Sequence, residues 1–121
     1  MAFNWEDFLK VARYLKDNPE VAHSTEAALR TAIGRAYFAA FCHAREHARV
    51  RLRYCPYYDG RDHKKLREHF QIQGRIKIAG DLEQLKLWRN DADYSPAFPP
   101  NIELVVQSAV ARAEGILNDL P

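Results

Sequence analysis

Residues 24–54 read STEAALRTAIGRAYFAAFCHAREHARVRLRY, a stretch with no proline and a single glycine. Ala, Leu and Arg dominate it, and all three are strong helix formers. Ser24 suits the N-cap position, and Glu26 places a negative charge in the first turn, where the helix dipole favours it. The stretch therefore predicts one helix of about 30 residues, roughly 45 Å long.

The two halves of this predicted helix differ in polarity. Between Ala36 and Ala44 nearly every side of the helix is apolar, and a helix that is apolar all round is buried all round. Beyond Ala44, arginines at positions 45, 49, 51 and 53 are spread around the helix axis. We therefore expect a central helix whose second half leaves the core and reaches solvent or an acidic partner.

The remaining sequence predicts four further helices, delimited by caps, glycines and prolines. Apolar residues recur at helical spacing, and no segment shows the alternation of a strand or a hairpin signal. The expected ranges are 4–18, 63–71, 81–92 and 101–120. The first of these is expected to begin at Asn4, the second after Asp62, the third after Gly80, and the last at Asn101 or Pro100. A break is expected at Gly74. We predict an all-α, up-and-down bundle of about five helices with one long central helix, as a single domain over residues 1–121.

Charge is distributed unevenly along the chain. The net charge is only +2, but residues 43–75 hold nine Lys/Arg and four Asp/Glu, which leaves +5 there and −3 elsewhere. This basic lobe could attract phosphate, or it could be an ordinary solvated helix end and loop. No segment has the apolar length of a membrane span and the start of the chain is not a signal peptide, so we expect a cytoplasmic protein.

Arg89 is an unusual residue because it falls between Leu82 and Leu85 on a helical wheel, inside an apolar stripe. Arginine keeps its charge near neutral pH, so a buried one needs a negative partner. Asp93, one turn later, could form a purely structural ion pair with it. The alternative is an arginine that binds an anion in a cleft.

Two histidine patterns are also notable. His63 lies on the apolar face of the third predicted helix, where a hydrogen-bonded core histidine is the simplest interpretation. His43 and His47 belong to an H-x-x-E-H sequence, which matches a zinc-binding pattern. Nothing in the sequence specifies a third ligand, so we predict no metal site and no cofactor.

Three segments, taken together and in this order, resemble the HEPN superfamily. GRAYFAAF at 34–41 resembles the family's R-x-Y-(Y/F)-A-x-F helix, and HKKLREHF at 63–70 matches an H-x-x-L-x-x-x-F element. LWRNDADY at 87–94 resembles the family's R-N motif and the "ADY" ending of one prokaryotic branch. The resemblance spans about residues 24–117.

This resemblance implies a small helical bundle that often forms a homodimer. It also implies a toxin–antitoxin or phage-defence setting, often with a minimal nucleotidyltransferase as partner. Many members are metal-independent ribonucleases that use an Arg, a polar residue after it and a His a few residues further on. Arg89 and Asn90 match the first two, whereas the positions that would hold the His carry Tyr94, Ser95 and Pro96.

The missing histidine changes the expected chemistry. RNA cleavage through the 2′-hydroxyl needs a group that titrates near neutral pH, and a tyrosine titrates near pH 10. We therefore predict a nucleotide- or RNA-binding protein with a degenerate nuclease site at Arg89, Asn90 and Tyr94, with phosphate contacts from Arg35, His63, Arg89 and Asp93. The alternatives are an active ribonuclease that uses His63 or His43, and a non-catalytic module that binds a protein partner.

Overall fold

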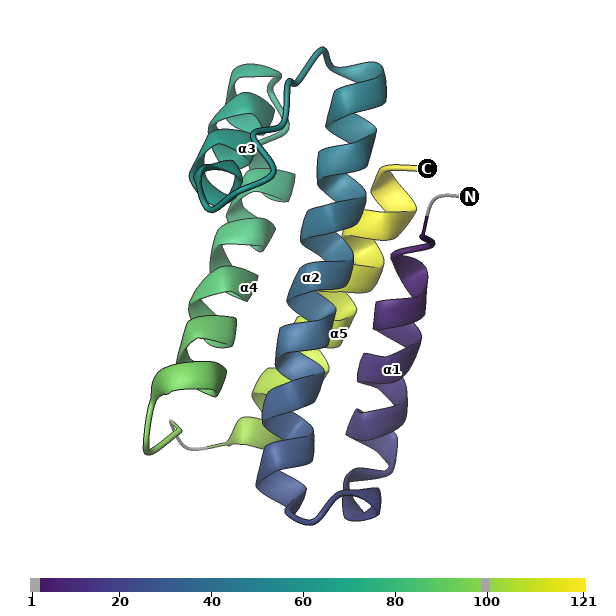
Figure 1. Cartoon of the computed structure of the whole chain (residues 1–121), viewed down its shortest axis with the longest axis vertical. Helices are drawn as coiled ribbons and strands as arrows, with labels where there is room; N and C mark the ends of the chain where they lie inside the picture. The colour runs from purple at the N-terminus through teal and green to yellow at the C-terminus, as the bar shows by residue number, and fades with distance from the viewer. Residues whose placement is uncertain (1–2, 99–100) are drawn as a thin grey trace.

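The long helix α2 is the axis of the molecule. The structure is a computed structural model that describes residues 3–98 and 101–121. Within these ranges it contains no strand and five α-helices, with a short 3₁₀-helix η1 after the first. Their bounds are α1 Glu6–Asp17, η1 Pro19–Val21, α2 Thr25–Arg51, α3 Arg61–Ile72, α4 Ile76–Tyr94 and α5 Ile102–Asp119. The predicted all-α bundle is confirmed (Figure 1).

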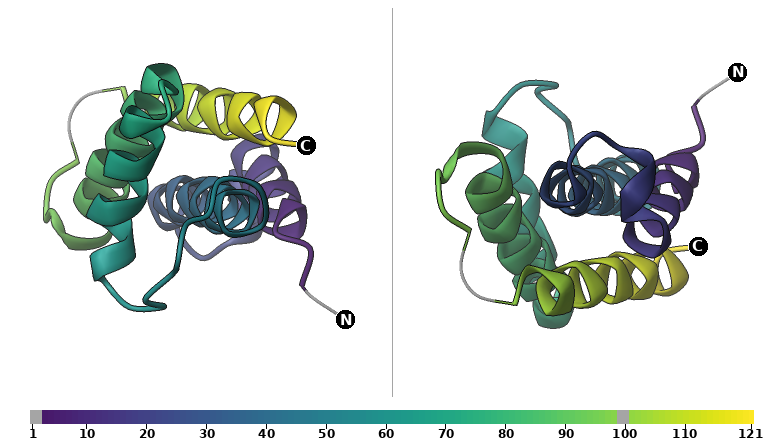
Figure 2. Two further views of the ribbon diagram at one scale, coloured as in Figure 1. Left: turned by 90° about the horizontal axis from the view of Figure 1, so that it is seen from above. Right: turned by 90° about the horizontal axis from the view of Figure 1, so that it is seen from below.

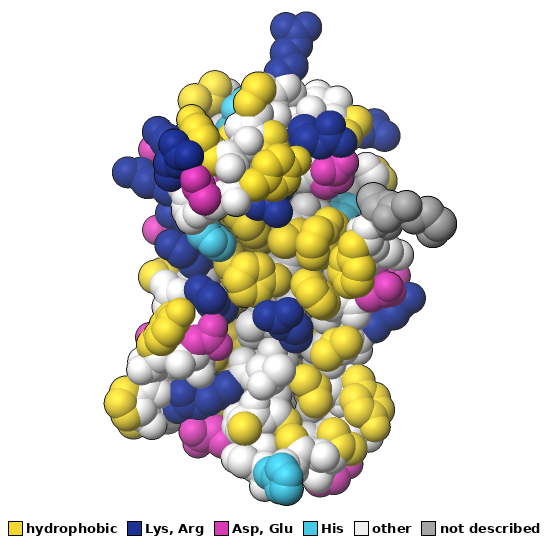
Figure 3. Space-filling model, in the orientation of Figure 1, with side chains coloured by type: hydrophobic (Ala, Val, Ile, Leu, Met, Phe, Trp, Pro, Cys, Tyr) yellow, Lys and Arg dark blue, Asp and Glu magenta, His cyan; other side chains and the backbone are white. Residues whose placement is uncertain are grey.

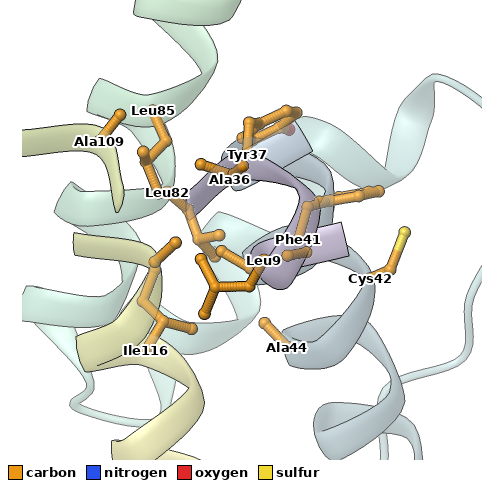
Figure 4. Close-up of a cluster of buried hydrophobic side chains, with 14 of the residues drawn as sticks. Leu9, Ala36, Tyr37, Phe41, Cys42, Ala44, Leu82, Leu85, Ala109 and Ile116 are labelled. Carbon is orange, nitrogen blue, oxygen red and sulfur yellow. The ribbon is translucent and has the colours of Figure 1, made fainter. Parts of the chain in front are cut away.

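Helix α2 packs against α1, α4 and α5. The views along the bundle in Figure 2 show these helices on different sides of α2, while α3 lies beside α4. Alanines of α2 face the neighbours without any exposed surface, among them Ala36, Ala40 and Ala44. Figure 4 shows Ala36 and Ala44 among leucines of α1 and α4 and Ile116 of α5. Small side chains let the neighbouring helices approach closely, so the prediction of a central helix is confirmed.

Two predicted helix boundaries are wrong. The central helix ends at Arg51 and not at Tyr54, because Arg53 adopts the left-handed conformation with φ 59°. Helix α4 begins at Ile76, five residues before Asp81, because Gly80 stays helical on an exposed face. The predicted break at Gly74 is confirmed, with φ 77°.

The predicted caps have mixed outcomes. Ser24 Oγ accepts a hydrogen bond from the Ala27 N–H at 3.2 Å, as an N-cap should. Asn4 Oδ1 accepts from the Glu6 N–H at 3.1 Å, although Trp5 occupies the cap position. Asn101 opens α5, and the alternative start Pro100 lies outside the described residues. Asp62 does not cap α3: it lies within the first turn, and its carboxylate accepts hydrogen bonds from the preceding loop.

None of the described helices combines the length and the apolar character that crossing a membrane would require.

Candidate functional site

Phe38, near the middle of α2, is the centre of the candidate site. Its ring is partly buried and lies between two guanidinium groups, with the Cζ atoms of Arg35 and Arg89 at 5.3 and 5.1 Å from the ring centroid. A guanidinium over an aromatic face is an attractive cation–π contact. In Figure 3, hydrophobic side chains gather at the centre of the visible face, with basic and histidine side chains around them.

His63, in the first turn of α3, joins this centre from another helix. Its ring stacks on Phe41 with centroids 4.4 Å apart and an interplanar angle of 17°. The same ring meets Phe38 edge-on at 6.4 Å and forms a short hydrogen bond with the Tyr37 hydroxyl through Nδ1. The prediction of a hydrogen-bonded histidine on an apolar face is therefore confirmed. The structure also brings His63 and Arg89 to the same ring, which the sequence spacing did not indicate.

The surroundings of His63 favour its neutral form. Burial lowers its pKa, and the positive charges of Lys86, Arg89, Arg67 and Arg45 lower it further. Burial raises the pKa of Tyr37, so the phenol keeps its proton. A protonated phenol can donate to Nδ1, and the proton of the neutral imidazole then sits on Nε2. The imidazole is thus held in place by Tyr37 and Phe41 and does not carry a permanent charge.

Arg89 has features of both alternatives: a structural ion pair with Asp93 and a guanidinium that binds an anion. Its Nε lies 2.9 Å from Asp93 Oδ2, an ion pair one helical turn apart. The N–H does not point along this line, so the buried Nε has no hydrogen-bond partner among the described residues. The Arg89 side chain is 20% exposed and Nη1 is 3.4 Å from Asn90 Oδ1. Because Nε is buried, an anion could reach this guanidinium only through its partly exposed Nη groups.

The other predicted residues lie at different distances from this centre. Arg35 contacts Phe8 as well as Phe38, with Cζ 4.7 Å from the Phe8 centroid. It forms no hydrogen bond or ion pair with the part of the chain that the structure describes. Tyr94 is at the end of α4, 75% exposed, with its ring centroid 5.8 Å from Arg89 Cζ. Asp93 is the only one of these residues that carries negative charge.

The sequence analysis did not identify several residues that lie near His63 and Arg89. Lys86 and Arg67 act on the pKa of His63, and Arg67 Nη1 also donates to the His63 carbonyl at 2.7 Å. Lys86 lies one turn before Arg89 and Arg67 one turn after His63, so the spacing of i and i+3 or i+4 could have identified both. The structure also shows that Arg30 Nη1 donates to the carbonyls of Ala92 and Ser95 at 3.1 and 2.7 Å, which anchors the end of α4 to α2. No short-range pattern could have indicated that contact.

The H-x-x-E-H residues lie elsewhere. His43 Nε2 is 2.5 Å from the Leu120 carbonyl, and Glu46 pairs with Arg49. Together with His47 they border a cavity of about 280 Å³ that is walled mainly by Trp5 and other apolar residues. No group of three metal-ligating side chains occurs among the described residues. His43 therefore does not share the surroundings of Arg89, and of the two histidines considered as a replacement base only His63 does.

Comparison of the chain with protein-family models, with curated proteins and with solved structures found no match.

Proposed function

We propose that the protein binds RNA or a nucleotide at the Phe38 cluster, which we define as Arg35, Phe38, His63, Lys86 and Arg89. The observation that carries the proposal is the convergence of Arg35, His63 and Arg89, from three helices, on the Phe38 ring, with the charge of Lys86 acting on His63. Phosphates are bound by guanidinium and ammonium groups, and a base can stack on an aromatic face. Asp93 is the carboxylate that pairs with this cluster, and a phosphate would compete with it for Arg89.

The biological setting follows from the HEPN resemblance. On that basis we propose a cytoplasmic component of a toxin–antitoxin or phage-defence module that acts as a homodimer, with a minimal nucleotidyltransferase as a possible partner. Tyr94 in place of the expected histidine supports binding over cleavage. A phosphate at Arg89 would leave Asn90 close enough to orient a ribose or a base edge.

Binding of a fluorescent single-stranded RNA of about 12 nucleotides tests the proposal. Arg89→Ala should weaken the affinity at least about tenfold, because a charge-assisted phosphate contact is lost. Arg13→Ala is the matched control: Arg13 also pairs with a carboxylate, Glu114 at 2.9 Å, but on the side of α1 and α5. Equal affinities of wild type and Arg89→Ala would contradict the proposal. They would favour the interaction module, in which Arg89 and Asp93 form a purely structural pair.

One observation favours an active ribonuclease as the second candidate. His63 is neutral, fixed by Tyr37 and close to the positive charge of Arg89 and Lys86. This role requires the other tautomer, in which Tyr37 accepts a hydrogen bond from Nδ1–H and the Nε2 lone pair takes a proton from a 2′-hydroxyl. Arg89 would then stabilise the negative charge that develops on the phosphate.

Incubation of labelled RNA with a large amount of protein in EDTA tests this second candidate. We expect the wild type to cleave slowly if His63 is the base, and His63→Gln to abolish cleavage while binding persists. His43→Gln is the control, because its ring bonds to Leu120 and lies outside the Phe38 cluster. Absence of cleavage by the wild type would remove the ribonuclease candidate and leave the binding proposal standing.

A further inference from the structure

The loop of residues 52–60, between α2 and α3, has an unusual backbone. Arg53 and Tyr58 both adopt left-handed conformations, with φ 59° and 56°, and neither is a glycine. Residues with a Cβ rarely adopt this conformation, and they persist in it only when the surrounding structure imposes it. Figure 2 shows the loop curving away from the end of α2 before α3 begins. Contacts with the rest of the fold must therefore hold the loop backbone in this conformation.

Asp62 provides these contacts and is the anchor of the loop. Its side chain is fully buried and accepts hydrogen bonds from the backbone N–H groups of Tyr57 and Tyr58 at 3.0 and 2.8 Å. The Tyr54 hydroxyl and Arg45 Nη1 donate to the same carboxylate at 2.5 and 3.2 Å. Burial alone would raise the pKa of Asp62, but these hydrogen bonds outweigh it and the pKa is lowered. A charged carboxylate therefore fixes the loop to the start of α3.

The fixed loop presents two aromatic rings to solvent. Tyr57 and Tyr58 are 47% and 65% exposed. Each ring carries a guanidinium, with Arg61 Cζ 4.2 Å from the Tyr57 centroid and Arg45 Cζ 4.9 Å from the Tyr58 centroid. Exposed rings paired with cations match the two components of a single-stranded nucleic acid, its bases and its phosphates.

The loop is joined to the Phe38 cluster by direct contacts. Arg45 lies over Tyr58 and also over Phe41, with Cζ 5.1 Å from the Phe41 centroid. Phe41 in turn stacks on His63, and His63 meets Phe38. Phe41 is buried, so these contacts do not form a surface path, but they fix the loop and the Phe38 cluster relative to each other.

The loop also borders a hollow of about 350 Å³. Arg53 and Lys65 line it together with Tyr57, and the acidic side chain there, Glu68, lies 3.7 Å from Lys65. The hollow beside Arg53 is therefore positively charged. A strand that continues past Tyr57 would meet further cations and not a carboxylate without a partner.

We propose that loop 52–60 is a second stacking platform for the same RNA strand that occupies the Phe38 cluster. Bases stack on Tyr57 and Tyr58, while the adjacent phosphates meet Arg53 and Lys65 in the hollow and compete with Asp59 for Arg61. Arg45 stays paired with Asp62. The platform rests on the proposed function and adds to it the class of ligand: single-stranded RNA longer than the few nucleotides that the Phe38 cluster alone can hold. Stacking on tyrosine does not distinguish bases, so the preference is for length and not for sequence.

A length series of oligouridylates tests the platform. Wild type should bind an oligomer of about 12 nucleotides more tightly than one of about 4. The combined variant Tyr57→Leu and Tyr58→Leu should bind the long oligomer at least about fivefold more weakly than wild type, with no change for the short one. Tyr14→Leu is the matched control, because Tyr14 is similarly exposed but lies on α1 outside both clusters. Tyr57→Leu alone serves if the double variant does not fold, because Tyr57 is not at a left-handed position.

The outcomes separate the two proposals. If wild type binds and the tyrosine variants keep its length dependence, the second platform is overturned and the Phe38 cluster remains. If the tyrosine variants lose the short oligomer as well, the loop belongs to the primary site and the second platform is again overturned. If wild type binds neither oligomer, both proposals fail. Arg89→Ala should weaken both lengths, which distinguishes loss of the first site from loss of the second.

Discussion

At the scale of single residues, two groups that face inward have different tasks. Arg89 pairs with Asp93 on its own helix and also covers Phe38. Asp62 accepts hydrogen bonds from four donors, and no capacity is left for a ligand. The difference lies in hydrogen bonding: the buried Nε of Arg89 has no such partner among the described residues. The binding proposal therefore depends on Arg89, whereas Asp62 is a structural residue.

Removal of the Asp62 carboxylate should destabilise the protein strongly. Asp62→Ala leaves the buried Tyr54 hydroxyl and the partly buried N–H groups of Tyr57 and Tyr58 without acceptors. We expect a loss of about 3 kcal/mol in the free energy of unfolding. Urea denaturation followed by circular dichroism measures this loss. Glu83→Ala is the control, because Glu83 is exposed, and its effect should stay within about 0.5 kcal/mol. A loss for Asp62→Ala as small as that of the control would show that the loop does not depend on this anchor.

Ionisation of the Asp62 carboxylate should make the stability of the protein depend on pH. Its pKa is lower in the folded protein than in the unfolded chain. The stabilisation by ionised Asp62 is therefore complete above the ordinary aspartate pKa of about 3.9, and is lost as the pH falls through the lower folded-state value. Denaturation midpoints of wild type and Asp62→Asn should converge on acidification below that ordinary value. A constant difference between them at all pH values would contradict the assignment.

At the scale of elements, helix α4 illustrates why a glycine is an ambiguous signal. Gly80 was expected to precede the helix, but it lies inside α4 on an exposed face, with nothing within 4 Å of an added Cβ. Gly74, six residues earlier, has a left-handed backbone and does separate α3 from α4. The helix could continue through Gly80 because its neighbours Ile78, Ala79 and Leu82 are buried against other helices. Packing outweighs the modest helix penalty of one glycine.

The two glycines should respond in opposite directions to the same substitution. Gly80→Ala should stabilise the protein by about 0.5–1 kcal/mol, because alanine favours the helix and meets no neighbour. Gly74→Ala should destabilise it by about 1–2 kcal/mol, because a Cβ is strained at positive φ. Thermal unfolding of both variants measures the difference. Destabilisation by Gly80→Ala would show that α4 does not continue through this residue in solution.

At the scale of the whole molecule, the bundle acts as a frame for the Phe38 cluster. Helix α2 contributes Arg35 and Phe38, α3 contributes His63, and α4 contributes Lys86 and Arg89. Arg30 ties the end of α4 to α2, and Asp62 ties the start of α3 to the end of α2 through Arg45. Both helices that carry the cationic groups are therefore fixed to the central helix near the site. Fixed groups lose little conformational freedom when a ligand binds, which favours affinity.

The sequence by itself determined the features that depend on local spacing. The apolar character of residues 36–44 on nearly every side of the helix predicted its burial, and the four-residue separation of Arg89 and Asp93 made their ion pair one of two alternatives. Both follow from the 3.6-residue turn of a helix, which places such residues together whatever the rest of the chain does. The basic segment 43–75 could also be identified from the sequence, by counting its charges.

Only the tertiary structure decided which distant residues meet. His63 reaches Phe41, Phe38 and the surroundings of Arg89 because α3 and α4 pack beside α2 at one particular height and rotation. Asp62 looked like a helix cap, yet the path of the chain brought the loop N–H groups to its carboxylate. Periodicity specifies which face of a helix is buried, but the angle and register of packing depend on how all the side chains of the core fit together. The proposed site is formed at that level.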